Sequence, residues 1–308
     1  MSRPLPGFLA RSPRMARMRW AVLCALLMLS SPAGRAEGAA AGPGASLPPE
    51  ESYLYDVDFI FFKNVADGTL RLRRLGNLSY RAELIAETKG FIGFLTGYRK
   101  NHYTSDLEYD PARRRFSARR YTKTVYRELD ISRTTMAIDR EARTVQWATT
   151  FNDEPLEKGT EPIPEGVVYE DLLSAFFNFR SGGFGPLSKG RHFTVVTLPG
   201  YDTPKEEKES GESLARNFDI RIADPETERR YREAYDREKE KGLLVLVKVP
   251  KELFGQETGE VRVWFDESLI PVSATIDRAY FLGDVRGILR KAVIGRPPVP
   301  PGANPPAR

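Results

Sequence analysis

The sequence predicts a mainly β protein of the α+β class, with a single curved, barrel-like antiparallel sheet of about twelve strands around one short buried helix, and a charged helix on the surface. Three observations predict this fold. Segments of strand length alternate apolar and polar residues between turn residues. Residues 171–180 are apolar on nearly every face at helical spacing. The strand-like segments mostly follow one another through short turns, which favours antiparallel pairing over a parallel α/β sheet.

Residues 1–36 are predicted to be a secretory signal peptide rather than part of the fold. They carry six Arg and no acidic residue, then the apolar run 20–29, then small residues ending at Ala36. The apolar run is shorter than the roughly 20 residues of a membrane-spanning helix. Cys24 lacks the small residues that precede a lipoprotein cysteine. We therefore expect a periplasmic protein without a transmembrane segment after cleavage; association with the outer membrane is left open.

Removing the signal peptide changes what the charge implies. Without its six Arg, the chain has 41 basic and 42 acidic residues, so the basic pI of about 9.2 largely belongs to the leader. A nucleic-acid partner then loses its electrostatic basis. Cys24 is the only cysteine, so the exported chain is expected to fold without disulfides.

The first half of the mature chain is predicted to be a strand meander. After a flexible linker at 37–52, strands are expected at 53–62, 69–75, 78–88, 98–109, 116–126, 128–138 and 144–150, with a hairpin turn at Asp67-Gly68. Residues 90–97 are apolar and rich in glycine, which fits a buried bend or a short turn of helix. The same pattern also fits a mobile lip over an apolar cavity, or a surface that contacts a membrane or partner.

Basic residues recur along these strands, at Arg113, Arg115, Lys123 and Arg127. They are consistent with a solvated sheet face, or with a groove for an anionic lipid or glycan. Residues 151–166 contain three prolines and are predicted to be a linker into the helix. In that helix Asp171 is the expected N-cap, Arg180 suits the C-terminal end, and Gly182 stops it.

The second half is predicted to complete the same domain, 53–294, without a second core. Strands are expected at 191–198, 217–222, 243–249, 260–265, 272–278 and 285–294. Residues 201–242 are predicted to be a charged insertion, with a helix from Asp224 to Gly242 that packs through Tyr231 and Tyr235. The Pro-rich tail 295–308 is expected to be disordered.

Three short motifs carry a family resemblance. They are Leu54-Tyr55-Asp56-Val57, then Asp171-Leu172-Leu173-Ser174-Ala175 leading to Arg180, and finally Val261-Arg262-Val263-Trp264-Phe265-Asp266 followed by Ile270-Pro271-Val272. With these the chain resembles the domain of unknown function 3108 (DUF3108) family of exported bacterial proteins, over most of 53–293. The resemblance implies a β-rich envelope domain with no established activity, and it transfers no catalytic residues. The stretch 201–242 is longer than the family pattern suggests.

No motif predicts a catalytic or metal site, and no cofactor is expected. His102 and His192 are 90 positions apart and lack ligands at zinc spacing. Residues 211–215 approximate a nucleophile elbow but follow a charged run instead of an apolar strand. Residues 182–186 are a helix stop and not a nucleotide loop. Two acid pairs, Asp56 with Asp58 and Asp106 with Glu108, each share a strand face and leave a glycosidase-like hydrolase open as a minor alternative.

The leading functional hypothesis is a non-catalytic envelope protein that binds a lipid, a glycolipid or a lipidated partner. Phe91, Phe94, Phe176 and Phe179 would line an apolar cavity, with Arg180 as an anion contact. The alternative is a structural or interaction module in which these residues are core and residues 201–242 recruit an envelope protein.

Overall fold

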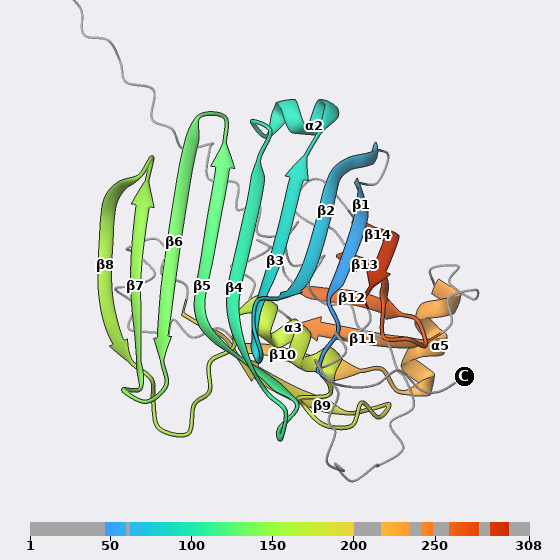
Figure 1. Cartoon of the computed structure of the whole chain (residues 1–308). Coiled ribbons are helices and arrows are strands. Elements are labelled where there is room, and N and C mark those ends of the chain that lie inside the picture. The colour runs from blue at the N-terminus through green and yellow to red at the C-terminus, as the bar shows by residue number, and fades with distance from the viewer. Residues whose placement is uncertain are drawn as a thin grey trace, which may run out of the picture.

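The structure is a computed structural model that describes residues 47–59, 62–199, 217–234, 242–248, 259–276 and 284–295. Within these ranges fourteen strands form one antiparallel sheet in the order β8-β7-β6-β5-β4-β3-β2-β1-β14-β13-β12-β11-β10-β9 (Figure 1). The strands are β1 (Glu51–Phe59), β2 (Phe62–Arg74), β3 (Ser79–Thr88), β4 (Lys100–Asp110), β5 (Arg115–Arg127), β6 (Asp130–Asp139), β7 (Thr144–Phe151), β8 (Glu154–Pro162), β9 (His192–Val196), β10 (Asn217–Ile222), β11 (Leu243–Lys248), β12 (Glu260–Phe265), β13 (Pro271–Ile276) and β14 (Val285–Ile294).

The sheet consists of two meanders joined by one long-range pairing. Strands β1 to β8 each pair with the next strand in sequence, as do β9 to β14, and β1 pairs with β14. The sheet curls without closing, and its second half crosses behind the first (Figure 1). The predicted mainly β fold with one curved antiparallel sheet is therefore confirmed.

The core lies inside the curl and is rich in aromatic side chains. Tyr53, Tyr80 and Phe116 face inward from β1, β3 and β5 and are almost fully buried. Helix α3 (Leu172–Ser181) packs on this inner face against β3, β4 and β5, and the Phe177 ring lies 6.3 Å from that of Phe116. Ten residues are too few for a stable isolated helix, so α3 depends on this packing.

Both ends of α3 are fixed by local chemistry, as the sequence predicted. The Asp171 carboxylate accepts hydrogen bonds from the backbone N–H groups of Leu173 (2.7 Å) and Ser174 (3.0 Å). The Ser174 side chain accepts in return from the Asp171 N–H, which completes a capping box. Gly182 ends the helix in the left-handed region, with φ of 79°.

A second, smaller apolar cluster lies on the outer face of β11 and β12, which corrects the expectation of a single core. Leu244, Leu246 and Trp264 form it under Tyr231 of helix α5 (Pro225–Ala234). Because α5 covers one face of β11 and the main core covers the other, the strand is apolar at nearly every position. The Asp224 carboxylate caps α5, as predicted. Tyr235 and the predicted helix end before Gly242 lie outside the described residues.

Two sequence predictions in the first meander are wrong. Residues 154–162, predicted to be a linker, form the edge strand β8, where Pro155 and Pro162 are tolerated because one side of an edge strand needs no ladder hydrogen bonds. Asp67-Gly68, predicted to be a hairpin turn, lies within β2 and pairs with Asp56 and Tyr55. The chain has already reversed before Phe62, so this dipeptide continues a strand.

Residues 1–36, predicted to be a signal peptide, residues 201–216 of the predicted charged insertion, and the predicted tail from residue 296 lie outside the described residues. Among the helices that the structure does describe, none combines the length and apolar character needed to cross a membrane.

Candidate functional site

Helix α2 (Gly90–Leu95) connects β3 to β4 at one end of the sheet, and it places two of the predicted ligand contacts. Glycines allow the sharp entry and exit, since Gly90 and Gly97 have φ of 60° and 65°. Ile92 and Gly93 are buried, whereas Phe91, Phe94 and Leu95 are 61%, 69% and 59% exposed. The segment is therefore a turn of helix at the edge of the core and not a buried bend within it.

Polar ties hold α2 in this position although it has no side-chain N-cap. Thr96 Oγ1 lies 2.9 Å from Thr88 Oγ1 and donates to the Ile92 carbonyl at 2.8 Å. The Tyr98 ring packs closely against Gly93, since a Cβ added to Gly93 would lie only 2.9 Å from the ring. These contacts hold α2 in one orientation, and in that orientation Phe91 and Phe94 are exposed.

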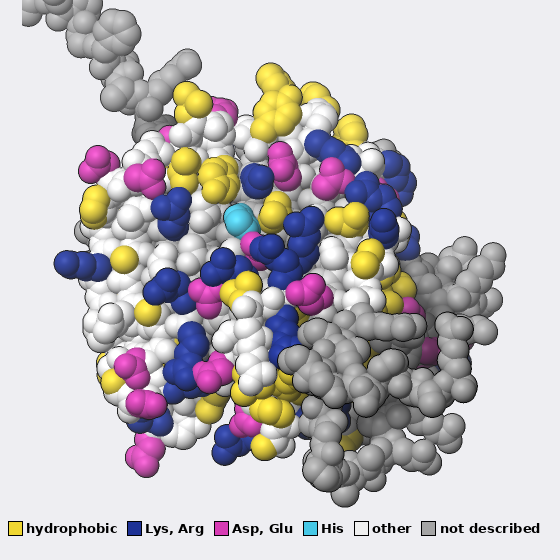
Figure 2. Space-filling model, viewed as in Figure 1, with side chains coloured by type: hydrophobic (Ala, Val, Ile, Leu, Met, Phe, Trp, Pro, Cys, Tyr) yellow, Lys and Arg dark blue, Asp and Glu magenta, His cyan; other side chains and the backbone are white. Residues whose placement is uncertain are grey.

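Further apolar side chains extend this exposed surface along the same end of the sheet. Phe62, at the start of β2, is 48% exposed, and its ring centroid lies 6.2 Å from that of Phe91. Leu129, in the β5–β6 turn, is 93% exposed and adjoins Glu128, whose N–H donates to the Gly97 carbonyl at 2.9 Å. In Figure 2 apolar side chains protrude at the α2 end, and others are spread over the same face. We call Phe62, Phe91, Phe94, Leu95 and Leu129 the apolar rim.

The structure does not bring the four predicted phenylalanines together. Phe176 and Phe179 lie on α3 and are only 4% and 6% exposed. Phe176 contacts Phe177 edge to face at 4.8 Å, and Phe179 stacks against Phe193 and Phe265 at 6.1 and 5.9 Å. These two rings are core, so the prediction that all four line one cavity is wrong.

Arg180 is also placed differently from the prediction. Its Nε and Nη2 donate to the Glu51 carboxylate at 2.6 and 2.8 Å, and its Nη1 donates to the Leu269 carbonyl. Burial opposes its charge, but hydrogen bonds and the charge of Glu51 more than compensate and raise the pKa of Arg180. Since Glu51 occupies the guanidinium, Arg180 is a buried tie between α3 and β1 and not an open anion contact.

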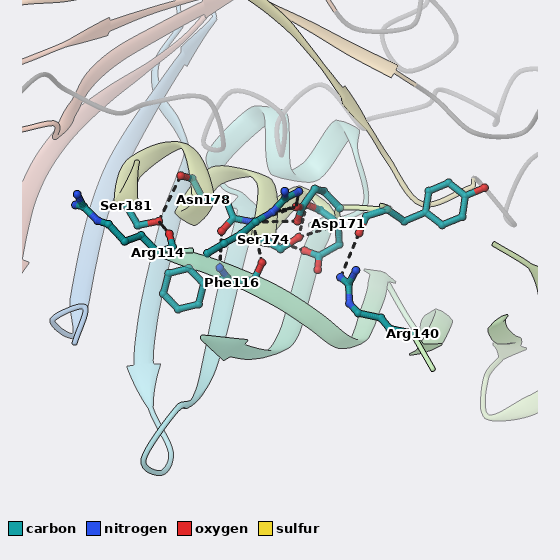
Figure 3. Close-up of polar contacts among 10 residues, drawn as sticks. Arg114, Phe116, Arg140, Asp171, Ser174, Asn178 and Ser181 are labelled. Atoms are coloured by element: carbon teal, nitrogen blue, oxygen red, sulfur yellow. Dashed lines mark hydrogen bonds and ion pairs between the residues drawn. The ribbon is translucent and has the colours of Figure 1, made fainter. Parts of the chain in front are cut away.

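A buried acidic cluster lies at the start of α3, beneath the inner face of β4 and β5 (Figure 3). Ser105 of β4 donates to Asp171 at 2.7 Å. Arg115 of β5 donates to Glu170 at 2.5 and 3.1 Å, and Asn178 donates to both Glu170 oxygens at 3.1 Å. Asn178 Oδ1 also accepts from the Phe116 N–H at 2.5 Å. The cluster therefore joins the helix to two strands of the sheet.

Burial changes the ionisation of this cluster. Desolvation raises the pKa of Asp171 to about 6, against the opposing effect of its hydrogen bonds from Ser105 and the helix N-terminus. Desolvation likewise lowers the pKa of Arg140, which donates to the Tyr169 carbonyl at 3.5 Å, with Glu170 opposing. Asp171 and Glu170 are 2% and 1% exposed. Because both side chains are buried, they have little access to a substrate, and their role is to anchor the helix.

The acid pairs considered for hydrolysis are bound to cations. Asp58 pairs with Lys63 at 3.0 Å and Asp56 with Arg290 at 3.1 Å. Asp106 pairs with Arg81 at 2.7 Å, and Glu108 pairs with Arg119. Because each carboxylate is paired with a cation, these acids do not form a site in which two carboxylates face one substrate.

The remaining predicted features are scattered. His102 lies on β4 and His192 begins β9, and the described residues contain no group of three or more His, Cys, Asp or Glu placed to hold a metal ion. Arg113 pairs with Asp110 in a turn, Arg115 binds buried Glu170, and Lys123 lies opposite Tyr103 on the inner face. Arg127 ends β5 opposite Asp130, so the four basic residues do not form one groove. Residues 211–215 lie outside the described residues.

Sequence reasoning missed Phe62 and Leu129 of the rim and Glu51 and Glu170 of the buried ties. Phe62 was included in a predicted strand, and Leu129 in another, because an apolar residue beside a turn has the same local pattern as one inside a strand. An apolar residue next to a turn in two of the hairpins, at Phe62 and Leu129, is the signal that could have found the rim.

Comparison with known proteins identifies the family. No relative was found among the curated proteins. Among solved structures, a "Beta-barrel-like Protein of Domain of Unknown Function DUF1849 from Brucella abortus" aligns with 81% of this chain and 98% of its own, at 10% identity and a TM-score of 0.43. The family described as "Protein of unknown function (DUF3108)" matches residues 54–287. This match spans most of the chain, which therefore belongs to the DUF3108 family.

Proposed function

We propose that this protein is a non-catalytic binding protein of the bacterial cell envelope, which binds a lipid or a lipidated partner at the apolar rim. The observation that carries the proposal is the outward exposure of Phe91, Phe94 and Leu95 on an anchored helix. Contiguous exposed apolar side chains of this size are typical of binding surfaces.

The energetic reason is the cost of leaving these side chains in water. Full burial of one large apolar side chain contributes roughly 1.5–3 kcal/mol. Three side chains on α2 could therefore contribute roughly 5 kcal/mol before the entropy of association is subtracted. That is enough for reversible binding of an acyl chain once Phe62 and Leu129 add to the contact.

Two further observations support a binding role without catalysis. The predicted acids are engaged in ion pairs, and the buried acids at the start of α3 are tied to the sheet. These observations favour a ligand contact made by shape and apolar surface.

The envelope location is part of the proposal and rests on residues 1–36, with their six Arg and apolar run. N-terminal sequencing of the protein recovered from a periplasmic fraction tests it, and a new N-terminus after Ala36 is the expected result. An intact Met1 in that fraction would contradict signal cleavage.

Binding is tested with protein purified from periplasm without detergent. Native mass spectrometry is expected to find a fraction with an added mass in the lipid range, and a fluorescent fatty-acid probe should bind the stripped protein. The variant Phe91→Asn/Phe94→Asn should weaken probe binding by about tenfold or more, since it removes two large apolar contacts.

The matched control is Leu75→Asn/Val168→Asn, which alters two apolar residues that are likewise exposed, 56% and 44%, in connections at the other end of the sheet. Its probe affinity should equal that of the original protein. Equal affinity in both double variants would place binding elsewhere, and absence of probe binding would overturn the proposed function.

A further inference from the structure

The two ends of the first meander differ in the side chains that their connections expose. The end that holds α2 carries every large aromatic residue that is exposed in the described part of the chain: Phe62, Phe91, Phe94, Tyr98 and Phe151. The connections at the opposite end, 111–114 and 140–143, carry Arg and Glu, and each of the other two connections there has one large exposed apolar residue, Leu75 or Val168. Because only one end of the meander exposes aromatic residues, that end is expected to face the binding partner.

The exposed residues come from several separate connections and do not line a single pocket. Phe62 follows the first strand reversal, α2 forms the second connection at this end, Leu129 lies in the third and Phe151 borders the fourth. Within the apolar rim, Phe62 starts β2 and Leu129 follows β5, and these strands are three positions apart in the sheet order, which corresponds to roughly 14 Å at about 4.8 Å per strand. Side chains that project from separate turns over such a width fit an extended, deformable surface better than one acyl chain.

Four of the cations beside these connections are paired with carboxylates. Lys63 pairs with Asp58 at 3.0 Å, Lys89 with Asp67 at 2.8 Å, and Lys100 with Glu87 at 3.7 Å. Arg133 pairs with Asp153 at 3.1 Å. Adjacent opposite charges of this kind match a zwitterionic headgroup layer, which also presents both signs, and provide no net field to attract anionic lipid.

We propose that the apolar rim docks onto the surface of a lipid bilayer with zwitterionic headgroups, inserting Phe91, Phe94, Leu95 and Leu129 at the level of the headgroups. This inference rests on the proposed function and specifies its partner as an intact bilayer surface. Aromatic side chains favour that interfacial level, and Tyr98 beside α2 has the amphipathic ring that suits it. The strands would then stand away from the membrane with the charged connections farthest from it.

The test is co-flotation of the full exported protein with phosphatidylcholine vesicles at low and high salt. The protein should float at both salt concentrations, because the contact is apolar and the neighbouring charges are paired. The variant Phe91→Asn/Phe94→Asn/Leu129→Asn should reduce the bound fraction by about tenfold or more, while Leu75→Asn/Val168→Asn should float like the original protein. Circular dichroism and thermal unfolding must show that both variants are folded.

Other outcomes overturn the inference and are distinguishable from failure of the proposed function. Probe binding without flotation would reject the bilayer and retain a ligand taken as single molecules. Flotation that requires anionic lipid and is lost at high salt would assign the contact to charge. Self-association abolished by the rim variant, without flotation, would assign the rim to a second copy of the chain.

Discussion

Helices α2 and α3 have similar compositions, but α3 is buried and α2 is largely exposed. Both are short, rich in phenylalanine and followed by glycine. On α3 the three Phe side chains are at most 6% exposed, whereas both Phe side chains on α2 are more than 60% exposed. Apolar composition alone therefore does not decide which segment becomes core.

The polar ties around each helix account for the difference. On α3, Asp171, Asn178 and Arg180 bind Ser105, the backbone of Phe116, and Glu51, which holds the helix inside the curled sheet. Helix α2 has no polar side chain of its own, and the residues on either side of it make the bonds, including backbone bonds to Val65 and Glu128. These bonds orient α2 across the edge of the core, where only one side can be buried. A short apolar helix is thus buried where its own polar side chains bond to distant strands.

The largest test of this comparison replaces one phenylalanine on each helix. Phe177→Ala should destabilise the protein by about 4 kcal/mol, because it leaves a cavity between α3 and Phe116. Phe91→Ala should change stability by less than about 0.5 kcal/mol, since its side chain is mostly in water. Chemical denaturation measures both free energies of unfolding, and equal losses would refute the distinction.

The next test removes a polar tie of α3. Arg180→Met should cost about 3 kcal/mol because it leaves the Glu51 carboxylate buried without its cation. Adding Glu51→Leu should recover much of that loss, since no charge is then left unpaired. Arg73→Met is the matched control: it breaks the exposed pair with Glu83 and should cost less than about 1 kcal/mol. A loss at Arg180 no larger than at Arg73 would contradict the anchoring role.

The smallest expected effect concerns pH. The pKa of Asp171 is about 6 in the folded protein against an ordinary value of 3.8, so between these values the folded protein keeps a proton that the unfolded chain has lost. The free energy of unfolding should therefore fall by about 2 kcal/mol through Asp171 as pH rises from about 4 to about 6, and this contribution should stay nearly constant above that range.

Asp171→Asn keeps a side chain that can cap the helix but does not titrate. The original protein should lose stability relative to this variant between pH 4 and 6, as measured by denaturant unfolding at several pH values. Parallel pH profiles of the two proteins would exclude Asp171 as the titrating group.

Local patterns predicted much of the fold and little of the site. Alternation predicted β1 because Tyr53, Tyr55 and Val57 all face the core, and Asp171 and Gly182 marked the ends of α3. Strand β8 was missed because it is an exposed edge strand without an apolar face. Arg180 was assigned to a ligand because its partner Glu51 is 129 positions away, a separation that no local pattern encodes. The exposure of α2 was undetermined for the same reason, since its sequence fits a buried segment equally well.

The ladder between β1 and β14 has a consequence for how this chain reaches its fold. It sets Glu51 opposite Ile294, and the Gly295 N–H donates to the Glu50 carbonyl at 2.8 Å, so the two ends of the domain meet. Each meander can assemble from hairpins, but this ladder must close a loop of roughly 240 residues and is expected to form late. A circularly permuted chain that links these ends would make the slowest pairing local, and it would convert the two meanders into one continuous folding unit.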